Sequence, residues 1–116
     1  MLNKIECIIK PYKLDDVKDA LQALGIQGIT VTEVQVCGTE KGHKEVYRGV
    51  EYVMDYLPKL KVEVVVPREQ TDRIVETMMF AARNGKISND RIYVLPIERA
   101  VRIRTGELDE CAVSFL

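Results

Sequence analysis

The sequence predicts a small α+β fold in which one βαβ unit occurs twice. Apolar runs rich in β-branched residues alternate with stretches of helical spacing, in the order strand, helix, strand, strand, helix, strand. The two halves also correspond residue by residue at a constant shift. Two such units in one domain give the ferredoxin-like arrangement, with four strands covered on one face by two helices.

The repeat is clearest where Lys4-Ile5-Glu6 corresponds to Lys61-Val62-Glu63. The same shift relates four further pairs, which are Asp15 with Asp72, Val17 with Ile74, Leu21 with Met78, and Gly28 with Gly85. Strand, helix and turn residues therefore recur in the same order, as expected for a duplicated unit.

In the first half, the run Ile5 to Ile9 predicts a buried strand that Pro11 closes. Apolar residues then recur at helical spacing, at Leu14, Val17, Leu21 and Leu24. Asp15 and Asp16 lie in the first turn, where the helix dipole favours negative charge, and Gly25 and Gly28 end the helix. Alternation from Thr30 to Cys37 predicts the second strand.

In the second half, Leu60 to Val66 predicts a buried strand ended by Pro67. A second amphipathic helix follows and stops at Asn84-Gly85; its apolar positions are Ile74, Val75, Met78, Met79 and Ala82. Arg91 to Leu95 predicts a fourth strand. A short fifth strand is expected where Val101 and Ile103 alternate with Arg102 and Arg104, and residues 107–116 are expected to form a loose tail.

Length and composition point to one soluble domain spanning residues 1–116. Seventeen basic residues against 18 acidic ones give no field that would attract nucleic acid. Three cysteines without metal-like spacing (Cys7, Cys37, Cys111) indicate reduced thiols in a cytoplasm. We expect no direct membrane insertion, because no signal peptide and no apolar stretch of about 20 residues occurs.

Two features predict interactions with other chains. If Val62, Val64 and Val66 face the helices, Val65 lies on a sheet face that would be apolar and open, so we expect subunits to associate through it. The polar stretch Gly38 to Asp55 is too long for an ordinary connection, and loops of that length are usually functional.

Four blocks in this order resemble the P-II signal-transduction family over residues 3–112: KPYKLDDVKDAL (10–21), KGHKEVYRGVEY (41–52), LPKLKVEVVVP (57–67) and VRIRTGE (101–107). The resemblance implies a homotrimer with nucleotide sites between subunits, where ATP and ADP compete and 2-oxoglutarate binds through magnesium on ATP. It also implies a long T-loop (38–55) that contacts an ammonium transporter or an enzyme or regulator of nitrogen metabolism.

The resemblance assigns nucleotide-binding roles to residues from several segments, including a phosphate loop (84–91) and a C-terminal loop and tail (102–116). They are Ile8, Thr30, Gly38, Thr39, Val65, Ser88, Asn89, Asp90, Arg91, Arg102 and Arg104. The sequence alone supports the arginine pair best, since two guanidiniums on one strand face suit a polyphosphate. The alternative is that both arginines lie on a solvated strand face and form ion pairs with Glu98 or Glu107.

Lys59 resembles the lysine that holds the distal carboxylate of 2-oxoglutarate; the alternative is an ordinary surface lysine. Tyr52 matches a tyrosine that is uridylylated in many relatives, and the alternative is an unmodified partner contact. Val50 stands where some relatives carry a phosphorylated serine, which excludes that control here. His43, the one histidine, has no ligand partners at metal spacing and is expected at the T-loop surface.

The chain departs from the family pattern around the effectors. Ser88-Asn89-Asp90-Arg91 replaces Gly-Asp-Gly-Lys, and Val36, Thr39 and Glu40 replace glycine, arginine and a magnesium-binding glutamine. Asp90 adds negative charge near the phosphates, and Glu40 would repel the carboxylates of 2-oxoglutarate. We therefore expect ADP or AMP to bind at least as well as ATP, and 2-oxoglutarate with magnesium to add little.

Three hypotheses follow from the sequence. The first is a P-II regulator that senses adenine nucleotides with an altered or lost 2-oxoglutarate response. The second is a paralogue that binds no nucleotide and acts on one partner as an interaction protein. The third, a ferredoxin-like enzyme, is disfavoured because no catalytic set with plausible spacing occurs. We expect a cytoplasmic protein, peripheral at the membrane where its partner is a transporter.

Overall fold

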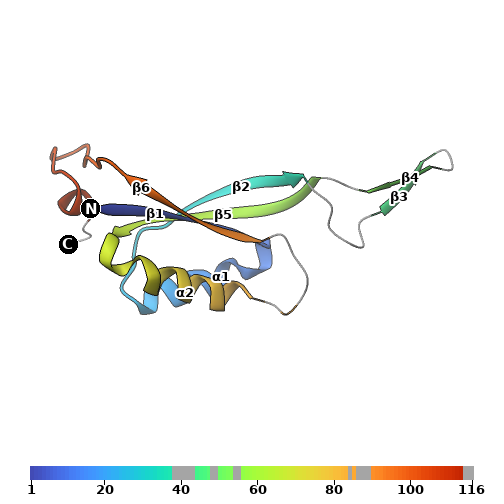
Figure 1. Cartoon of the computed structure of the whole chain (residues 1–116), viewed down its shortest axis with the longest axis horizontal. Helices are drawn as coiled ribbons and strands as arrows, with labels where there is room; N and C mark the ends of the chain where they lie inside the picture. Colours follow the sequence, from blue (N-terminus) through green and yellow to red (C-terminus); the bar gives the residue numbers. More distant parts are fainter. Residues whose placement is uncertain (38–43, 48–49, 54–55, 84, 86–89, 114–116) are drawn as a thin grey trace.

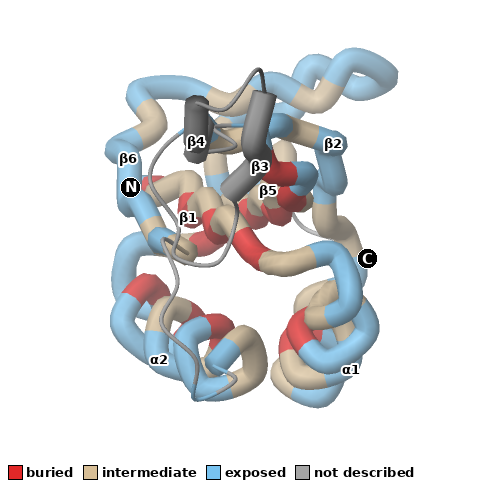
Figure 2. The backbone as a smooth tube through the Cα atoms, turned by 90° about the vertical axis from the view of Figure 1, so that its right-hand side faces the viewer, coloured by how far each residue is buried: buried red, intermediate tan, exposed pale blue. Residues whose placement is uncertain are grey.

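A four-stranded antiparallel sheet with two helices on one face forms the body of the protein (Figures 1 and 2). The computed structural model describes residues 1–37, 56–83, 85 and 90–113, and the backbone of 44–47 and 50–53. The strand order is β2-β5-β1-β6. The strands are β1 (Leu2–Ile9), β2 (Thr30–Cys37), β5 (Tyr56–Pro67) and β6 (Arg91–Ile97); the helices are α1 (Leu14–Ala23) and α2 (Thr71–Ala82). This arrangement confirms the predicted fold class.

Local sequence explains where the helices begin and end. Short 3-10 turns lead into both of them, η1 (Pro11–Lys13) before α1 and η2 (Arg68–Gln70) before α2. Pro11 suits a first helical turn because its missing N–H would have no partner there. Gly25 follows α1 with φ 85°, a left-handed conformation that glycine adopts without steric cost.

The core lies between the sheet and the helices. Alternate residues of β1 and β5 point towards α1 and α2, and this alternation appears as a red and tan pattern along the central strands (Figure 2). Ten buried side chains form one cluster: Ile5, Cys7, Ile9, Val17, Leu21, Val62, Val64, Val66, Ile74 and Met78. Members from corresponding positions of the two halves meet here, as the repeat predicts.

The face of the sheet opposite the helices is partly apolar, as expected, because Tyr93 and Leu95 on β6 are exposed there, but it also carries charged side chains. Lys4 Nζ lies 3.1 Å from Glu6 and 3.2 Å from Glu63, and Lys61 Nζ lies 3.5 Å from Glu63. These four side chains form a charge network over β1 and β5, next to Val65. Lys4 and Glu6 on β1, and Lys61 and Glu63 on β5, alternate along their strands with the buried core residues. The network therefore lies on the side of the sheet that faces away from the core.

The prediction of a fifth strand around Val101 and Ile103 is wrong. The prediction of a loose tail is also wrong for the part of the tail that the structure describes. Val101 forms only an isolated bridge with Leu108, and residues 103–105 form a turn. A short helix, α3 (Glu110–Val113), follows. Gly106, at φ 74°, lets the chain reverse so that its N–H donates to the Arg102 carbonyl at 2.7 Å. Backbone groups are therefore satisfied inside the segment, without a strand partner.

The T-loop region contains a hairpin beyond the ends of β2 and β5 (Figure 1). Its strands are β3 (Lys44–Tyr47) and β4 (Val50–Val53), paired with Lys44 opposite Val53. Residues 38–43, 48–49 and 54–55 lie outside the described residues. Within the described part of the chain, no helix combines the length and apolarity needed to cross a membrane.

Candidate effector site

Two lysines and one aspartate meet where β1 ends and β6 begins. Lys59 Nζ donates a hydrogen bond to Asp90 Oδ1 at 3.0 Å, and Lys10 Nζ lies 3.7 Å from Asp90 Oδ2. Lys59 comes from β5, Lys10 follows β1, and Asp90 directly precedes β6. The Lys59 side chain is only 4 % exposed. We call these three residues the Asp90 cluster.

The Asp90 cluster holds two ammonium groups against one carboxylate. Lys10 Nζ is buried and has no hydrogen-bond partner among the residues that the structure describes. Burial, followed by the negative charge of Asp90, raises the pKa of the Cys7 thiol to about 12, so Cys7 is protonated at neutral pH. The cluster therefore places two ammonium groups, the kind of group that binds anions, against a largely buried carboxylate.

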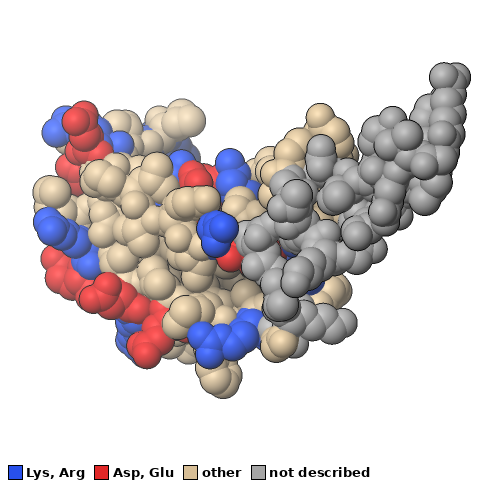
Figure 3. Space-filling model, turned by 45° about the vertical axis from the view of Figure 1, so that its right-hand side comes forward, with Lys and Arg blue, Asp and Glu red and all other residues tan. Residues whose placement is uncertain are grey.

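An open cleft of about 500 Å³ lies beside the cluster. Its lining includes three predicted site residues, Ile8, Asp90 and Arg91, together with Cys7 and Met79. Ile8 and Arg91 are direct partners in the pairing of β1 with β6. Figure 3 turns this end of the molecule towards the viewer and shows Lys and Arg side chains along the border of the undescribed residues.

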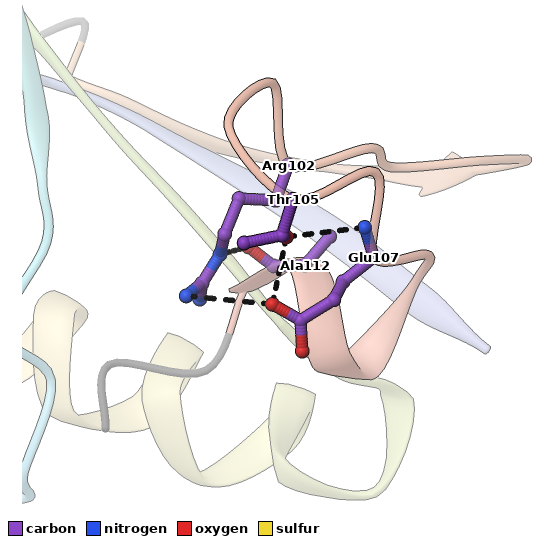
Figure 4. Close-up of polar contacts among 4 residues, drawn as sticks. All are labelled: Arg102, Thr105, Glu107 and Ala112. Carbon is purple, nitrogen blue, oxygen red and sulfur yellow. Dashed lines mark hydrogen bonds and ion pairs between the residues drawn. The ribbon is translucent and has the colours of Figure 1, made fainter.

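Arg102 belongs to a second polar group, formed by the C-terminal segment (Figure 4). Its Nε donates to the Ala112 carbonyl at 3.3 Å, and its Nη1 lies 3.9 Å from Glu107 Oε1. Thr105 Oγ1 donates to the same Glu107 oxygen at 2.7 Å. Arg104 is exposed in the turn, so the two arginines do not share a strand face as predicted. Arg102 does contact Glu107, one of the two alternative partners, but it does so from a turn and not from a strand face.

β6 begins at Arg91 and runs to the opposite end of the sheet, where the C-terminal segment that contains Arg102 continues (Figure 1). Arg91 pairs with Ile8 at the end of β1, whereas Arg102 bonds to α3, which the Met1 amino group holds through Glu110 at 2.6 Å. Leu2 and Ile8 are six residue steps apart along β1, about 20 Å of extended chain. One chain therefore does not bring both arginines to one ligand.

The other predicted site residues are placed as follows. Thr30 pairs with Glu63 and Val65 with Lys4, so both lie in the sheet near the charge network. Gly38, Thr39, Glu40, Ser88 and Asn89 lie outside the described residues. Tyr52 pairs with Glu45 in the backbone of the hairpin. No group of three metal-ligating side chains occurs among the residues that are described, which do not include Glu40.

Sequence reasoning missed Lys10 and Ala112. Lys10 opens the first resembling block, yet nothing in the sequence indicates that it faces Asp90 across the sheet. Glu107 was considered only as a partner of a strand face. The Ala112 carbonyl is a main-chain group in a segment expected to be loose, so no side-chain pattern could have identified it.

Comparison with known proteins identifies the family. Residues 2–107 match the family model described as Nitrogen regulatory protein P-II. The Nitrogen regulatory protein P-II of Pasteurella multocida is 54 % identical over 112 residues, 97 % of this chain and all of that protein. The Nitrogen regulatory protein P-II 1 of Escherichia coli K12 is 52 % identical over the same shares.

A solved structure agrees with the sequence relatives. It is described as the crystal structure of Arabidopsis thaliana PII bound to citrate, with a TM-score of 0.78, 33 % identity, and coverage of 96 % of this chain and 91 % of that one. The relatives are named as regulatory proteins, which sets the chain apart from enzymes of similar fold. Fold, resembling blocks and matched length all lead to one conclusion: the chain belongs to the P-II family of nitrogen regulatory proteins.

Proposed function

We propose that this protein is a homotrimeric regulator that binds ADP or ATP, and also AMP, between its subunits. The observation that carries the proposal is the separation of Arg91 from Arg102 at opposite ends of the sheet. Phosphates accept forked hydrogen bonds from guanidinium groups, and one nucleotide meets both arginines only if two chains supply them. A closed ring of subunits repeats that junction with no free end.

The sheet face opposite the helices supports association. Tyr93 on β6 is 51 % exposed and lies opposite Glu6, while Leu95 lies opposite Lys4. Burying these apolar side chains favours subunit contact. The charge network beside them is already paired, so it enters an interface without leaving a lone charge.

The altered response to carboxylates is part of the proposal. The plant relative is described as bound to citrate, which supports carboxylate binding in the family. Lys59 and Lys10 provide ammonium groups for such a ligand, but Asp90 already contacts both. Magnesium would belong with Glu40 and the nucleotide phosphates, since carboxylates are good magnesium ligands. We expect 2-oxoglutarate to add little to ATP binding.

The output is proposed to pass through the T-loop. The β3–β4 hairpin presents backbone from this segment beyond the sheet, and an ammonium transporter or a nitrogen-metabolism enzyme or regulator is the expected partner. Contact with a transporter would bring a cytoplasmic protein to the membrane without insertion. Tyr52, in β4, is the candidate for uridylylation.

A second candidate function is that of a paralogue which binds no nucleotide and acts on one partner only. One observation favours it: the chain's own groups already contact two of the cationic side chains assigned to effectors. Asp90 contacts Lys59, and Glu107 and Ala112 contact Arg102. If these contacts outcompete ligands at cellular concentrations, only the interaction function remains.

Calorimetry with AMP, ADP and ATP, each with and without magnesium and 2-oxoglutarate, separates the two candidates. We expect saturable nucleotide binding, with ADP or AMP at least as tight as ATP and little gain from 2-oxoglutarate. Absence of binding by all three nucleotides would favour the paralogue. Tight ATP binding that 2-oxoglutarate strengthens further would contradict the altered response. Glu40→Gln should restore part of that gain if the glutamate opposes the ligand.

A further inference from the structure

The contact between Asp90 and Lys59 has the chemistry of a bound carboxylate. The aspartate Oδ1 accepts a 3.0 Å hydrogen bond from an ammonium group that is almost fully buried. Its second oxygen lies 3.7 Å from Lys10 Nζ. Each oxygen of one carboxylate thus faces a different lysine, which is how two cations would hold a small external carboxylate.

We propose that Asp90 is an internal competitor for carboxylate ligands at Lys59 and Lys10 and thereby sets the effector specificity of this chain. The inference rests on the proposed function in one respect, namely that an external carboxylate is an effector. It adds to the role expected from the sequence, in which Asp90 repels nucleotide phosphates, because the two carboxylate oxygens of Asp90 face Lys59 and Lys10.

Competition follows from geometry and charge. An incoming carboxylate that replaced Asp90 at the lysines would leave the aspartate charge partly buried beside Cys7. Burial, and after it the negative charge of Asp90, already raises the pKa of the Cys7 thiol. A ligand that bound without displacing it would place two negative charges within a few ångströms. Both routes weaken binding relative to a chain that has no side chain at position 90.

The reverse effect should appear when the aspartate charge is removed. Asp90→Asn keeps the shape and a hydrogen-bond acceptor but removes the carboxylate charge that contacts both lysines. Asp90→Gly removes the side chain, and glycine is the residue of the family pattern at this position, so the fold accepts it. Lys59→Met removes the ammonium group that holds the ligand.

The test is titration of these variants with 2-oxoglutarate, and with citrate as a second probe, with and without magnesium-ATP. We expect Asp90→Asn and Asp90→Gly to bind at least about tenfold more tightly than the unmodified chain. Lys59→Met should bind neither probe. The matched control is Asp15→Asn on α1, which removes the same charge from an exposed pair with Lys18 at 3.6 Å and should change nothing.

The outcomes separate this inference from the proposed function. Equal or weaker carboxylate binding by both Asp90 variants, each shown to be folded by circular dichroism, would overturn the inference whatever the nucleotide result. A tenfold gain in Asp15→Asn as well would overturn it too, because net charge alone would then explain the effect. If the unmodified chain binds no nucleotide, the proposed function fails, and the titrations without ATP still decide the role of Asp90.

Discussion

Arg102 Nε donates a hydrogen bond of 3.3 Å to the main-chain carbonyl of Ala112, so a side chain assigned to phosphate is held by the protein's own C-terminal segment. Glu107 adds negative charge 3.9 Å from the same guanidinium. A phosphate that binds Arg102 must compete with these acceptors. The affinity for nucleotide therefore depends on residues after the turn as well as on the arginine.

Glu107→Gln should strengthen nucleotide binding modestly. The substitution keeps an oxygen for Thr105 but removes the charge that competes with phosphate for Arg102. Partly exposed ion pairs are worth up to about 1 kcal/mol, so we expect a gain of at most about fivefold in ADP affinity by calorimetry. Glu76→Gln on the exposed face of α2 is the charge-matched control. Weaker binding by Glu107→Gln would show that Glu107 helps to position Arg102 instead.

Two residues on α2 should differ sharply in their effect on stability. Met78 is fully buried in the core, whereas Phe80 on the same helix is 81 % exposed. Met78→Ala should lower the free energy of unfolding by about 2–5 kcal/mol through lost burial and a residual cavity. Phe80→Ala should stay within about 0.5 kcal/mol. Urea unfolding at one fixed chain concentration checks both, and a large loss for Phe80→Ala would place that ring in an interface.

The fold was predictable from local patterns because its core repeats them. The strands β1 and β5 show period-two alternation, and the helices α1 and α2 show helical spacing. Both patterns identify the residues that face the single core, so Ile5, Val64, Leu21 and Met78 could be assigned to the core without coordinates. The C-terminal segment misled the same logic. Val101 and Ile103 alternate with arginines, yet Gly106 permits a turn that satisfies the backbone locally.

The site was predictable only in part, because its contacts join distant segments. Resemblance indicated Asp90, Arg91 and Lys59 one by one. It could not indicate that Asp90 faces Lys59, since that depends on how β5 and β6 flank β1. Lys10 has no pattern of its own and gains its role only from this sheet order.

The charge network around Glu63 should make stability depend on pH. Burial alone would raise the pKa of Glu63, but hydrogen bonds and charge from Lys4 and Lys61 outweigh it and lower the pKa from its ordinary 4.5. Hydrogen bonds to Glu6 and Glu63 raise the pKa of Lys4 from 10.5. The stabilisation is therefore complete between these two ordinary values. It is lost as the pH falls through the lowered pKa of Glu63 or rises through the raised pKa of Lys4.

Glu63→Gln tests this dependence. At neutral pH the variant should unfold at lower urea concentration than the unmodified protein, and the difference should shrink as the pH falls below 4.5. Glu76→Gln again serves as the control, because it removes a glutamate charge from the exposed face of a helix. A difference between Glu63→Gln and the unmodified protein that stayed constant down to acid pH would mean that the side chain acts through packing and not through its charge.

Mixing of variant subunits should reveal whether Arg91 and Arg102 act across a subunit junction. Arg91→Ala and Arg102→Ala should each weaken ADP binding, since charge-assisted hydrogen bonds contribute about 1.5–3 kcal/mol, or roughly ten- to hundredfold. In a trimer assembled from equal amounts of both variants, a junction is intact when one chain keeps Arg91 and its neighbour keeps Arg102. Every trimer that contains both variants has one such junction among its three.

Co-expression with two different affinity tags, followed by tandem purification, isolates these mixed trimers for calorimetry. A class of sites with the unmodified affinity should appear in them and be absent from each variant alone. In the control mixture, Arg73→Ala, a change of an exposed arginine on α2, replaces one of the two variants. Its chains keep both Arg91 and Arg102, so the fraction of intact junctions should be higher in this mixture. No recovery in the mixture of Arg91→Ala with Arg102→Ala would mean that one chain supplies both arginines. The turn that carries Arg102 would then have to leave α3 and cross about 20 Å to reach Arg91.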